Sequence, residues 1–316
     1  MTKQIIMGTG PLGLAIMDEL LSRDQPVTLI SRSGKVREKL PSTVELLSGD
    51  ISDPHQVKNL CTGAEKVYFC AMPPYTRWPE EFPALLNGVI EGLAHSGTTL
   101  IYGDNLYMYG STQGKAMTED MPYKADSRKG KVRADLSFRL LEARKSGKLD
   151  VKILRGSDFF GPRVQNSSFG TPVFQAALEG KTVNLLGNPD LPHSITYIKD
   201  FARSMVLLAD SPKVEPAVFH VPNAPVGSSR DFVVQVEREL DMNLKIRATG
   251  KKMATFLGLF IPIVKEMKEM IYQWDEPFIA DHSLFSSHFD FTPTPRDVAI
   301  KETALWYLTQ KQKGGQ

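Results

Sequence analysis

Residues 3–34, KQIIMGTGPLGLAIMDELLSRDQPVTLISRSG, decide the fold. Residues 4–8 form an apolar run that predicts a short strand, and residues 26–31 predict a second one. Between them, residues 11–24 place apolar side chains at helical spacing after a glycine turn. Strand, turn, helix and strand in this order are typical of a βαβ unit with parallel strands.

The same alternation continues along the first half of the chain. We expect further strands at residues 44–50, 66–71, 98–104 and 150–157, and helices at residues 54–63, 84–97 and 133–147. This pattern predicts an α/β fold, a Rossmann-type doubly wound parallel sheet covered by helices on both faces.

From about Gly161 onward, proline and glycine become frequent and the regular alternation weakens. We expect helices at residues 171–180 and 230–241 and one more strand at residues 217–223. The predicted domains are a dinucleotide-binding domain at residues 1–165, with segments near 192–225 returning to its sheet, and a smaller substrate domain, mostly residues 166–316.

Composition excludes several classes of function. The 316 residues include 38 basic and 36 acidic ones, and a net charge of +2 gives no field for nucleic acid or a membrane surface. No apolar window is long enough to cross a bilayer, and the most apolar stretch, residues 253–264, predicts a buried or lid helix. The histidines show no metal-ligand spacing, so we expect no metal site. Cys61 and Cys70 suit core packing in a reducing cytoplasm, and with no leader sequence in view we expect a cytoplasmic protein.

Gly8-Thr9-Gly10-Pro11-Leu12-Gly13 matches the pattern G-x-G-x-x-G. The first glycine permits a tight turn, the second lets the backbone approach a pyrophosphate, and the third allows close packing of helix on strand. The phosphates then lie at the helix N-terminus. Alone the pattern also fits a plain glycine turn, but its position inside a βαβ unit predicts dinucleotide binding.

The end of the second strand discriminates between two dinucleotides. NAD sites place Asp or Glu there for the ribose 2′-hydroxyl, whereas Arg accommodates a 2′-phosphate. This chain has Ser31, Arg32 and Ser33, followed by Lys35, so NADP(H) is favoured over NAD(H). A solvated surface arginine is the alternative.

Asp50 follows the third predicted strand. Its carboxylate suits the adenine amino group, with Ile51 against the ring. Capping of the helix that begins near Pro54 is an equally compatible role for Asp50.

Seven segments in a fixed order carry a family resemblance. They are the glycine motif, GDISD at 49–53, CAMP at 70–73, YGDNLYMYG at 102–110, LRGSDFFGP at 154–162, HSITYIKDFARSMVLL at 193–208 and FTPTPRDVAIKETALWY at 291–307. Across nearly its whole length the chain resembles the extended short-chain dehydrogenase/reductase superfamily, which includes nucleotide-sugar epimerases and dehydratases.

The resemblance implies a site. Cys70, Ala71 and Met72 would pass beside the nicotinamide ribose. The family uses a catalytic Tyr, a Lys four residues later and a Ser or Thr that polarises the substrate oxygen. Alignment of the motifs places these roles at Ser127, Lys131 and Asn105, respectively.

Ser127 departs from the family pattern, because a serine hydroxyl cannot replace a phenol, whose pKa is about 10, as proton donor. Lys131 can still bind a ribose hydroxyl. Tyr123, eight residues before Lys131, is a candidate acid, and packing at a sheet edge is its alternative. His193 can exchange a proton near neutral pH, with a structural role as its alternative. The chain therefore resembles an atypical member of the superfamily.

A substrate wall is expected after the fourth strand. Tyr75, Trp78 and Phe82 lie in the proline-rich segment 73–83, interpreted as a stiff loop that lines a partly apolar site, with packing of the loop on the core as the alternative. The resemblance adds Asp158 and Tyr197 as pocket candidates.

Three functions remain open. The first is an NADP-dependent oxidoreductase that reduces a carbonyl or enone of a small, partly apolar molecule. The alternatives are a nucleotide-sugar epimerase or dehydratase, and a non-catalytic NADP-binding redox sensor. The expected partner is a small-molecule substrate, and the sequence leaves a homodimer open.

Overall fold

The computed structural model describes residues 3–212, 214–249 and 269–314. The helix expected at 253–264 lies outside these ranges. The chain divides into two compact units. The first consists of Met1–Met108, Arg128–Arg155 and Phe201–Phe219, and the second of Tyr109–Ser127, Gly156–Asp200 and His220–Gln316.

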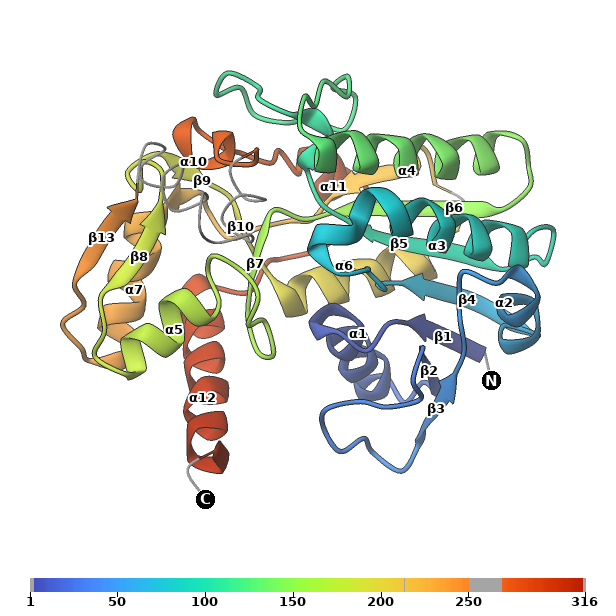
Figure 1. The fold of residues 1–316 in the computed structure, drawn as a ribbon, viewed down its shortest axis with the longest axis horizontal. Coiled ribbons are helices and arrows are strands. Elements are labelled where there is room, and N and C mark those ends of the chain that lie inside the picture. Colours follow the sequence, from blue (N-terminus) through green and yellow to red (C-terminus); the bar gives the residue numbers. More distant parts are fainter. Residues whose placement is uncertain (1–2, 213, 250–268, 315–316) are drawn as a thin grey trace. The chain divides into compact units, whose positions relative to one another are not determined.

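The first unit is built on a seven-stranded sheet (Figure 1). Its strands are β1 (Lys3–Met7), β2 (Val27–Ser31), β3 (Val44–Ser48), β4 (Ala64–Phe69), β5 (Thr99–Asp104), β6 (Asp150–Arg155) and β11 (Val218–His220). They lie in the order β3-β2-β1-β4-β5-β6-β11, and every pair from β3 to β6 is parallel. The strand order reverses direction between β1 and β4, and this switch point is where ligands bind in open α/β sheets.

Helices cover both faces of this sheet. They are α1 (Pro11–Ser22), α2 (Pro54–Leu60), α3 (Trp78–Gly92), α4 (Arg128–Lys145) and α6 (Ile198–Asp210), with short 3₁₀ turns η1 (Tyr75–Arg77) and η2 (Tyr107–Tyr109). Ile5 and Met7 of β1 belong to a buried cluster that includes Leu86 of α3. Ile6, which points to the opposite face, lies against Gly13 of α1. The doubly wound parallel fold predicted from the sequence is confirmed.

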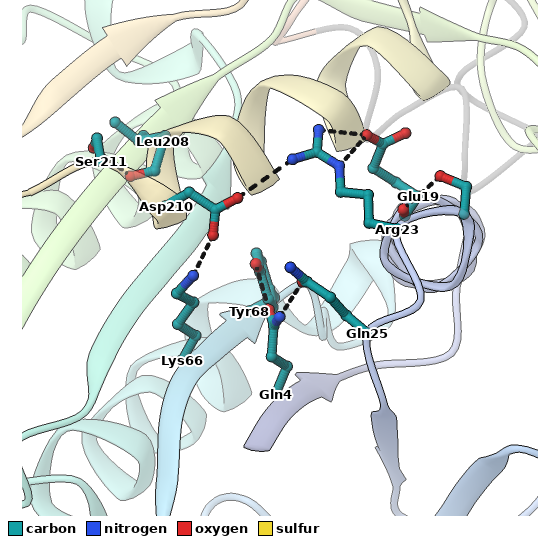
Figure 2. Close-up of polar contacts among 10 residues, drawn as sticks. Gln4, Glu19, Arg23, Gln25, Lys66, Tyr68, Leu208, Asp210 and Ser211 are labelled. Atoms are coloured by element: carbon teal, nitrogen blue, oxygen red, sulfur yellow. Dashed lines mark hydrogen bonds and ion pairs between the residues drawn. The ribbon is translucent and has the colours of Figure 1, made fainter. Parts of the chain in front are cut away.

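A polar cluster lies at the end of α6, on the α1 side of the sheet (Figure 2). The carboxylate of Asp210 is paired with the ammonium of Lys66 on β4 and, at 3.3 Å, with the guanidinium of Arg23 after α1. The buried hydroxyl of Tyr68 donates to Gln4 at 2.9 Å. These contacts join α6, β4, β1 and the end of α1 and leave the opposite, carboxyl ends of the strands to other groups.

The second unit combines short strands with helices. Its elements are β7 (Asp158–Phe160), α5 (Thr171–Leu178), β8 (Val183–Leu186), β9 (Pro192–His193), β10 (Ile195–Tyr197), β12 (Gly227–Ser228), α7 (Ser229–Leu240), β13 (Ile246–Thr249), α10 (Tyr272–Asp275), α11 (Ser283–His288) and α12 (Arg296–Gly314). A buried cluster centred on Phe160, Phe174 and Phe232 packs α5, α7 and α12 together. Ser228 and Asp231 form a reciprocal capping box that starts α7.

Candidate functional site

The glycine loop, residues 8–13, joins β1 to α1 at the carboxyl end of the sheet. Gly8 has a φ of +114°, and a Cβ there would lie 2.8 Å from the backbone nitrogen of Ala71. A Cβ on Gly13 would lie 2.1 Å from the carbonyl oxygen of Gly8, but one on Gly10 would meet nothing within 4 Å. Gly8 and Gly13 therefore serve close packing, whereas Gly10 leaves open space before the helix.

The first turn of α1 is suited to an anion. Gly10 is its N-cap, so no side chain caps the helix, and no acidic residue lies in the first turn. Pro11 begins the helix, while Thr9 and Leu12 are half-buried. Unpaired backbone N–H groups and the helix dipole attract phosphate at such an end. Together with the space at Gly10, this loop fits a dinucleotide pyrophosphate.

The end of β2 carries the basic residue expected from the sequence. Ser31 accepts from the backbone N–H of Lys35 at 3.2 Å, which closes a turn through Ser33 and Gly34, whose φ is +61°. The backbone oxygen of Arg32 accepts from Ser48 on the neighbouring strand at 2.9 Å. The side chain of Arg32 is exposed, so its guanidinium is accessible to a ligand.

Asp50 does not cap α2. Its carboxylate accepts from the backbone N–H of Ser52 at 3.0 Å and from the Ser52 hydroxyl at 2.7 Å. These two hydrogen bonds lower the pKa of Asp50, and the charge of Arg32 adds to them. The N-cap of α2 is Asp53, which accepts from the backbone N–H of His55. The capping alternative for Asp50 is therefore wrong, and Ile51 beside it is buried.

The segment after β4 runs beside the glycine loop. Cys70 donates its backbone N–H to the oxygen of Met7 at 2.9 Å, and Ala71 lies against Gly8. Met72 is 55% exposed, and its sulfur accepts from Arg133 at 3.4 Å. The structure thus brings residues 70–72 to the glycine loop at the switch point.

The residues aligned with the family's catalytic positions differ in burial. Asn105 follows β5, is buried, and accepts from the backbone N–H of Tyr107 at 3.1 Å, so its amide nitrogen remains the donor that a polarising role requires. Ser127 is buried directly before α4. Lys131 lies in α4 with an exposed side chain.

The sequence analysis did not predict that two cations on α4 are buried. Lys129 is 1% exposed and Arg133 is 5% exposed. The apolar face of α4 contains Leu136 and Leu140, and extending that helical spacing backward reaches Arg133 and Lys129. The sequence therefore contained a signal for their burial, although their charge made them look like surface residues.

The proposed substrate wall is not a loop. Residues 75–77 form η1, and α3 begins at Trp78. Trp78 and Phe82 are 2% and 1% exposed and pack edge to face with ring centroids 5.6 Å apart. Both belong to the buried core of the first unit, so the packing alternative describes them better than a pocket wall does. Tyr75 is only half-buried.

A buried ionic network lies at the carboxyl end of β5. Arg133 donates to Asp104 at 3.0 Å and to the hydroxyl of Tyr102 at 2.7 Å. Arg155 lies 3.5 Å from the other carboxylate oxygen and donates to Ser137 at 3.1 Å. Burial raises the pKa of Tyr102, so its phenol stays neutral. One carboxylate thus serves two buried guanidinium groups, next to Asn105 in the chain.

In the second unit, His193 is paired with Asp158. Its Nε2 lies 2.7 Å from Oδ2 of Asp158, and the ring is 2% exposed. Phe278 and Trp274 stack on the ring at centroid distances of 5.3 and 6.0 Å, and Phe169 lies 5.6 Å away. The structure brings these two predicted residues together, inside an aromatic enclosure.

The tyrosine candidates of the second unit have partners. Tyr197 donates its hydroxyl to Glu302 on α12, and burial together with that carboxylate raises its pKa. Tyr123 packs edge to face on Tyr109 at 5.8 Å. Tyr109 lies 2.8 Å from Nε2 of His220, whose Nδ1 lies 2.8 Å from a backbone oxygen. A carbonyl only accepts, so Nδ1 carries the proton and Tyr109 donates to Nε2.

Neither a metal centre nor a membrane span emerges from the parts of the chain that the structure describes. No group of three His, Cys, Asp or Glu side chains is suited to a metal ion within residues 3–212, 214–249 and 269–314. In the same ranges no helix is sufficiently long and apolar to cross a bilayer.

Comparison with protein families gives one match. The family described as "NAD dependent epimerase/dehydratase family" matches residues 5–221. Those residues include the glycine loop, the segment after β4 and the network at β5. A comparison with curated proteins gives no match.

Solved structures share the fold over the full length. The chain is 18% identical to the Bacillus cereus UDP-glucuronic acid 4-epimerase in complex with UDP-glucuronic acid and NAD, with a TM-score of 0.79 over 98% of this chain and 100% of that one. It is 19% identical to the Methanobrevibacter ruminantium UDP-N-acetylglucosamine 4-epimerase, with a TM-score of 0.78 over 98% and 99%. For the Bordetella bronchiseptica enzyme WbmH in complex with NAD⁺, the identity is 18% and the TM-score 0.75, over 98% and 99%.

Proposed function

Since the chain belongs to the NAD dependent epimerase/dehydratase family, we propose that it binds a nicotinamide dinucleotide in its first unit and acts on a carbinol carbon of a hydroxylated small molecule. The observation that carries the proposal is the glycine loop, where Gly10 leaves open space at an uncapped helix N-terminus beside the switch point. Residues 8–13 would hold the pyrophosphate, and residues 70–72 would lie along the nicotinamide half. When bound, the dinucleotide supplies reversible hydride acceptance.

A nucleotide-activated sugar is the proposed substrate class. The support is the likeness of fold over the whole chain to the two 4-epimerases of UDP-sugars, at 19% and 18% identity. An epimerase or dehydratase reaction is therefore preferred over the reduction of a free carbonyl compound, for which the comparisons offer nothing.

Arg32 favours a second candidate. An exposed guanidinium stands at the end of β2, and residues 31–35 contain no acidic side chain for a ribose 2′-hydroxyl. This supports a preference for NADP(H) and, with it, an oxidoreductase that reduces a carbonyl or enone. The two candidates share the dinucleotide site and differ in whether the cofactor is consumed.

The experiment incubates the purified chain with NAD⁺ or NADP⁺ and with UDP-glucose, UDP-glucuronic acid or UDP-N-acetylglucosamine, and follows the sugar protons by NMR. The expected result is a new epimer or dehydrated sugar without net change in the dinucleotide. Unchanged sugars, together with NADPH consumption in the presence of ketones or enones, would favour the reductase. Dinucleotide binding without either reaction would overturn both candidates.

A further inference from the structure

Two cation–ring contacts stand one helical turn apart in the first unit. The ammonium of Lys129 lies 4.3 Å from the ring centroid of Tyr75, and the guanidinium of Arg133 lies 4.3 Å from that of Trp78. Lys129 and Arg133 are four residues apart on α4, and Tyr75 and Trp78 are three apart across η1 and the start of α3. In both pairs a cation of α4 lies over an aromatic ring of η1 or of the start of α3.

The Lys129–Tyr75 pair follows residues 70–72 in the chain, and Met72 of that segment contacts Arg133 of the other pair at 3.4 Å. Tyr75 is three residues after Met72, in the segment that leaves β4 beside Gly8. Tyr75 is half-buried, whereas Trp78 in the other cation–ring pair is buried in the core. Of the two rings, only that of Tyr75 carries a hydroxyl and lies at the edge of the core.

The Arg133–Trp78 pair is held by further contacts in the core. Arg133 is held by Asp104 and Tyr102 and also lies 4.7 Å from the ring of Phe82. These contacts hold α4 one helical turn from Lys129.

The family's acid is missing at its usual place, where this chain has Ser127. We propose that Tyr75 and Lys129 form the acid–base pair of the reaction, with Tyr75 exchanging the substrate's proton and Lys129 stabilising the phenolate. This inference rests on the proposed function. It assigns the tyrosine and the lysine to two different elements, η1 and α4, instead of to one helix.

The step balances in protons and electrons. A bound, oxidised dinucleotide would accept the carbinol hydrogen with its electron pair, while the substrate hydroxyl gives its proton to the Tyr75 phenolate, which leaves a carbonyl and a neutral phenol. The reverse step returns that proton to the alkoxide oxygen. A cation over the ring stabilises the anionic form of the phenol throughout.

The test compares Tyr75→Phe, Lys129→Met and Lys129→Arg with the wild-type chain. Tyr75→Phe keeps the ring under Lys129 and should lower turnover about 100-fold or more, with dinucleotide affinity and melting temperature retained. Lys129→Met should lower turnover as well, and Lys129→Arg should recover part of it. Lys145→Met, an exposed lysine in the last turn of α4, is the matched control and should leave turnover unchanged.

A second readout is independent of turnover. Ultraviolet difference absorbance against pH, with Tyr75→Phe as the reference, isolates the phenolate of Tyr75. Lys129→Met should move its midpoint to higher pH by about one unit, and Lys145→Met should not move it. An unmoved midpoint in Lys129→Met, or turnover of Tyr75→Phe within about threefold of wild type, would overturn the pair.

The two proposals fail differently. If the wild-type chain binds the dinucleotide but turns over no substrate, the proposed function fails, and the phenolate midpoint alone decides whether Lys129 controls Tyr75. If the wild-type chain is active and Tyr75→Phe equally so, the proposed function stands and the pair is overturned.

Discussion

The carboxylate of Asp104 lies 3.0 Å from the guanidinium of Arg133, and both side chains are buried at the carboxyl end of β5. The other oxygen of the same carboxylate faces Arg155 at 3.5 Å. The first unit therefore holds two buried cations against one anion beside Asn105. Such a network is expensive to break, because a buried charge that loses its partner keeps its desolvation cost.

Replacement of this carboxylate should destabilise the protein strongly. We expect Asp104→Asn to lower the free energy of unfolding by about 3–5 kcal/mol, since two guanidinium groups would stay buried without a counterion. Urea unfolding followed by circular dichroism measures the change. Asp135→Asn, which breaks an exposed pair with Arg139 on the same helix, is the control and should cost no more than about 0.5 kcal/mol. Equal effects of the two substitutions would contradict the importance of the network.

The glycines of the loop should respond differently to the same methyl group. In Gly13→Ala the new Cβ would lie 2.1 Å from the oxygen of Gly8, so the backbone must shift, at a cost of about 1–3 kcal/mol in stability. In Gly10→Ala the Cβ enters open space and the backbone φ is −78°, so stability should change by less than about 1 kcal/mol.

Gly10→Ala, which should hardly change stability, should instead change the affinity for the dinucleotide. Gly10→Ala should weaken dinucleotide binding about tenfold or more, because the methyl group would occupy the space that the pyrophosphate would need at the proposed site. Calorimetric titration with NAD⁺ and NADP⁺ measures this in a variant that remains folded. Wild-type affinity of Gly10→Ala for both dinucleotides would place the pyrophosphate elsewhere.

The sheet and its glycine loop were predictable, because their determinants are local. Apolar runs separated by helical periodicity specify strands and helices in turn, and a βαβ unit has essentially one parallel arrangement. The end of β2 could also be predicted from the sequence, and Arg32 directly follows the strand. The sequence also indicated that Cys61 is a core residue, and burial raises the pKa of its thiol to about 12.

The segment after β4 was predicted wrongly because its prolines were interpreted as stiffening a loop. Pro79 lies at the start of α3, where a missing N–H costs nothing, and Pro83 is accommodated inside the same helix. Trp78 and Phe82 then face the core instead of a pocket. The pairing of His193 with Asp158 joins residues 35 positions apart and depends on tertiary packing, which no local pattern reveals.

Arg32 should determine the choice between the two dinucleotides. Arg32→Ala should reduce NADP⁺ affinity by about 10- to 100-fold, the worth of charge-assisted hydrogen bonds to a 2′-phosphate, and leave NAD⁺ affinity within about twofold. Titration of each dinucleotide with intrinsic fluorescence as the signal measures both constants. Arg37→Ala, an exposed arginine further along the same loop, is the control. Parallel losses for NAD⁺ and NADP⁺ would contradict a role in selecting the 2′-phosphate.

Asp50 provides a prediction on pH. Its pKa is lowered in the folded protein, first by the Ser52 hydroxyl, then by the Ser52 backbone N–H, and to a lesser degree by Arg32. A depressed carboxyl pKa contributes stability above the unfolded value of 3.8, and that contribution disappears as the pH falls through the folded value. Ser52→Ala removes the largest cause, so Asp50 should protonate at higher pH than in the wild type.

The measurement is the pH dependence of the ¹³C shift of the Asp50 carboxyl group. Ser52→Ala should raise the titration midpoint more than Arg32→Ala does, because the hydrogen bond acts at 2.7 Å while the charge acts from an exposed side chain. Ser22→Ala, which removes a hydroxyl bonded to a backbone oxygen at the end of α1, should leave the midpoint unchanged. A larger effect from Arg32→Ala would show that the cation, and not the turn at Ser52, keeps Asp50 ionised.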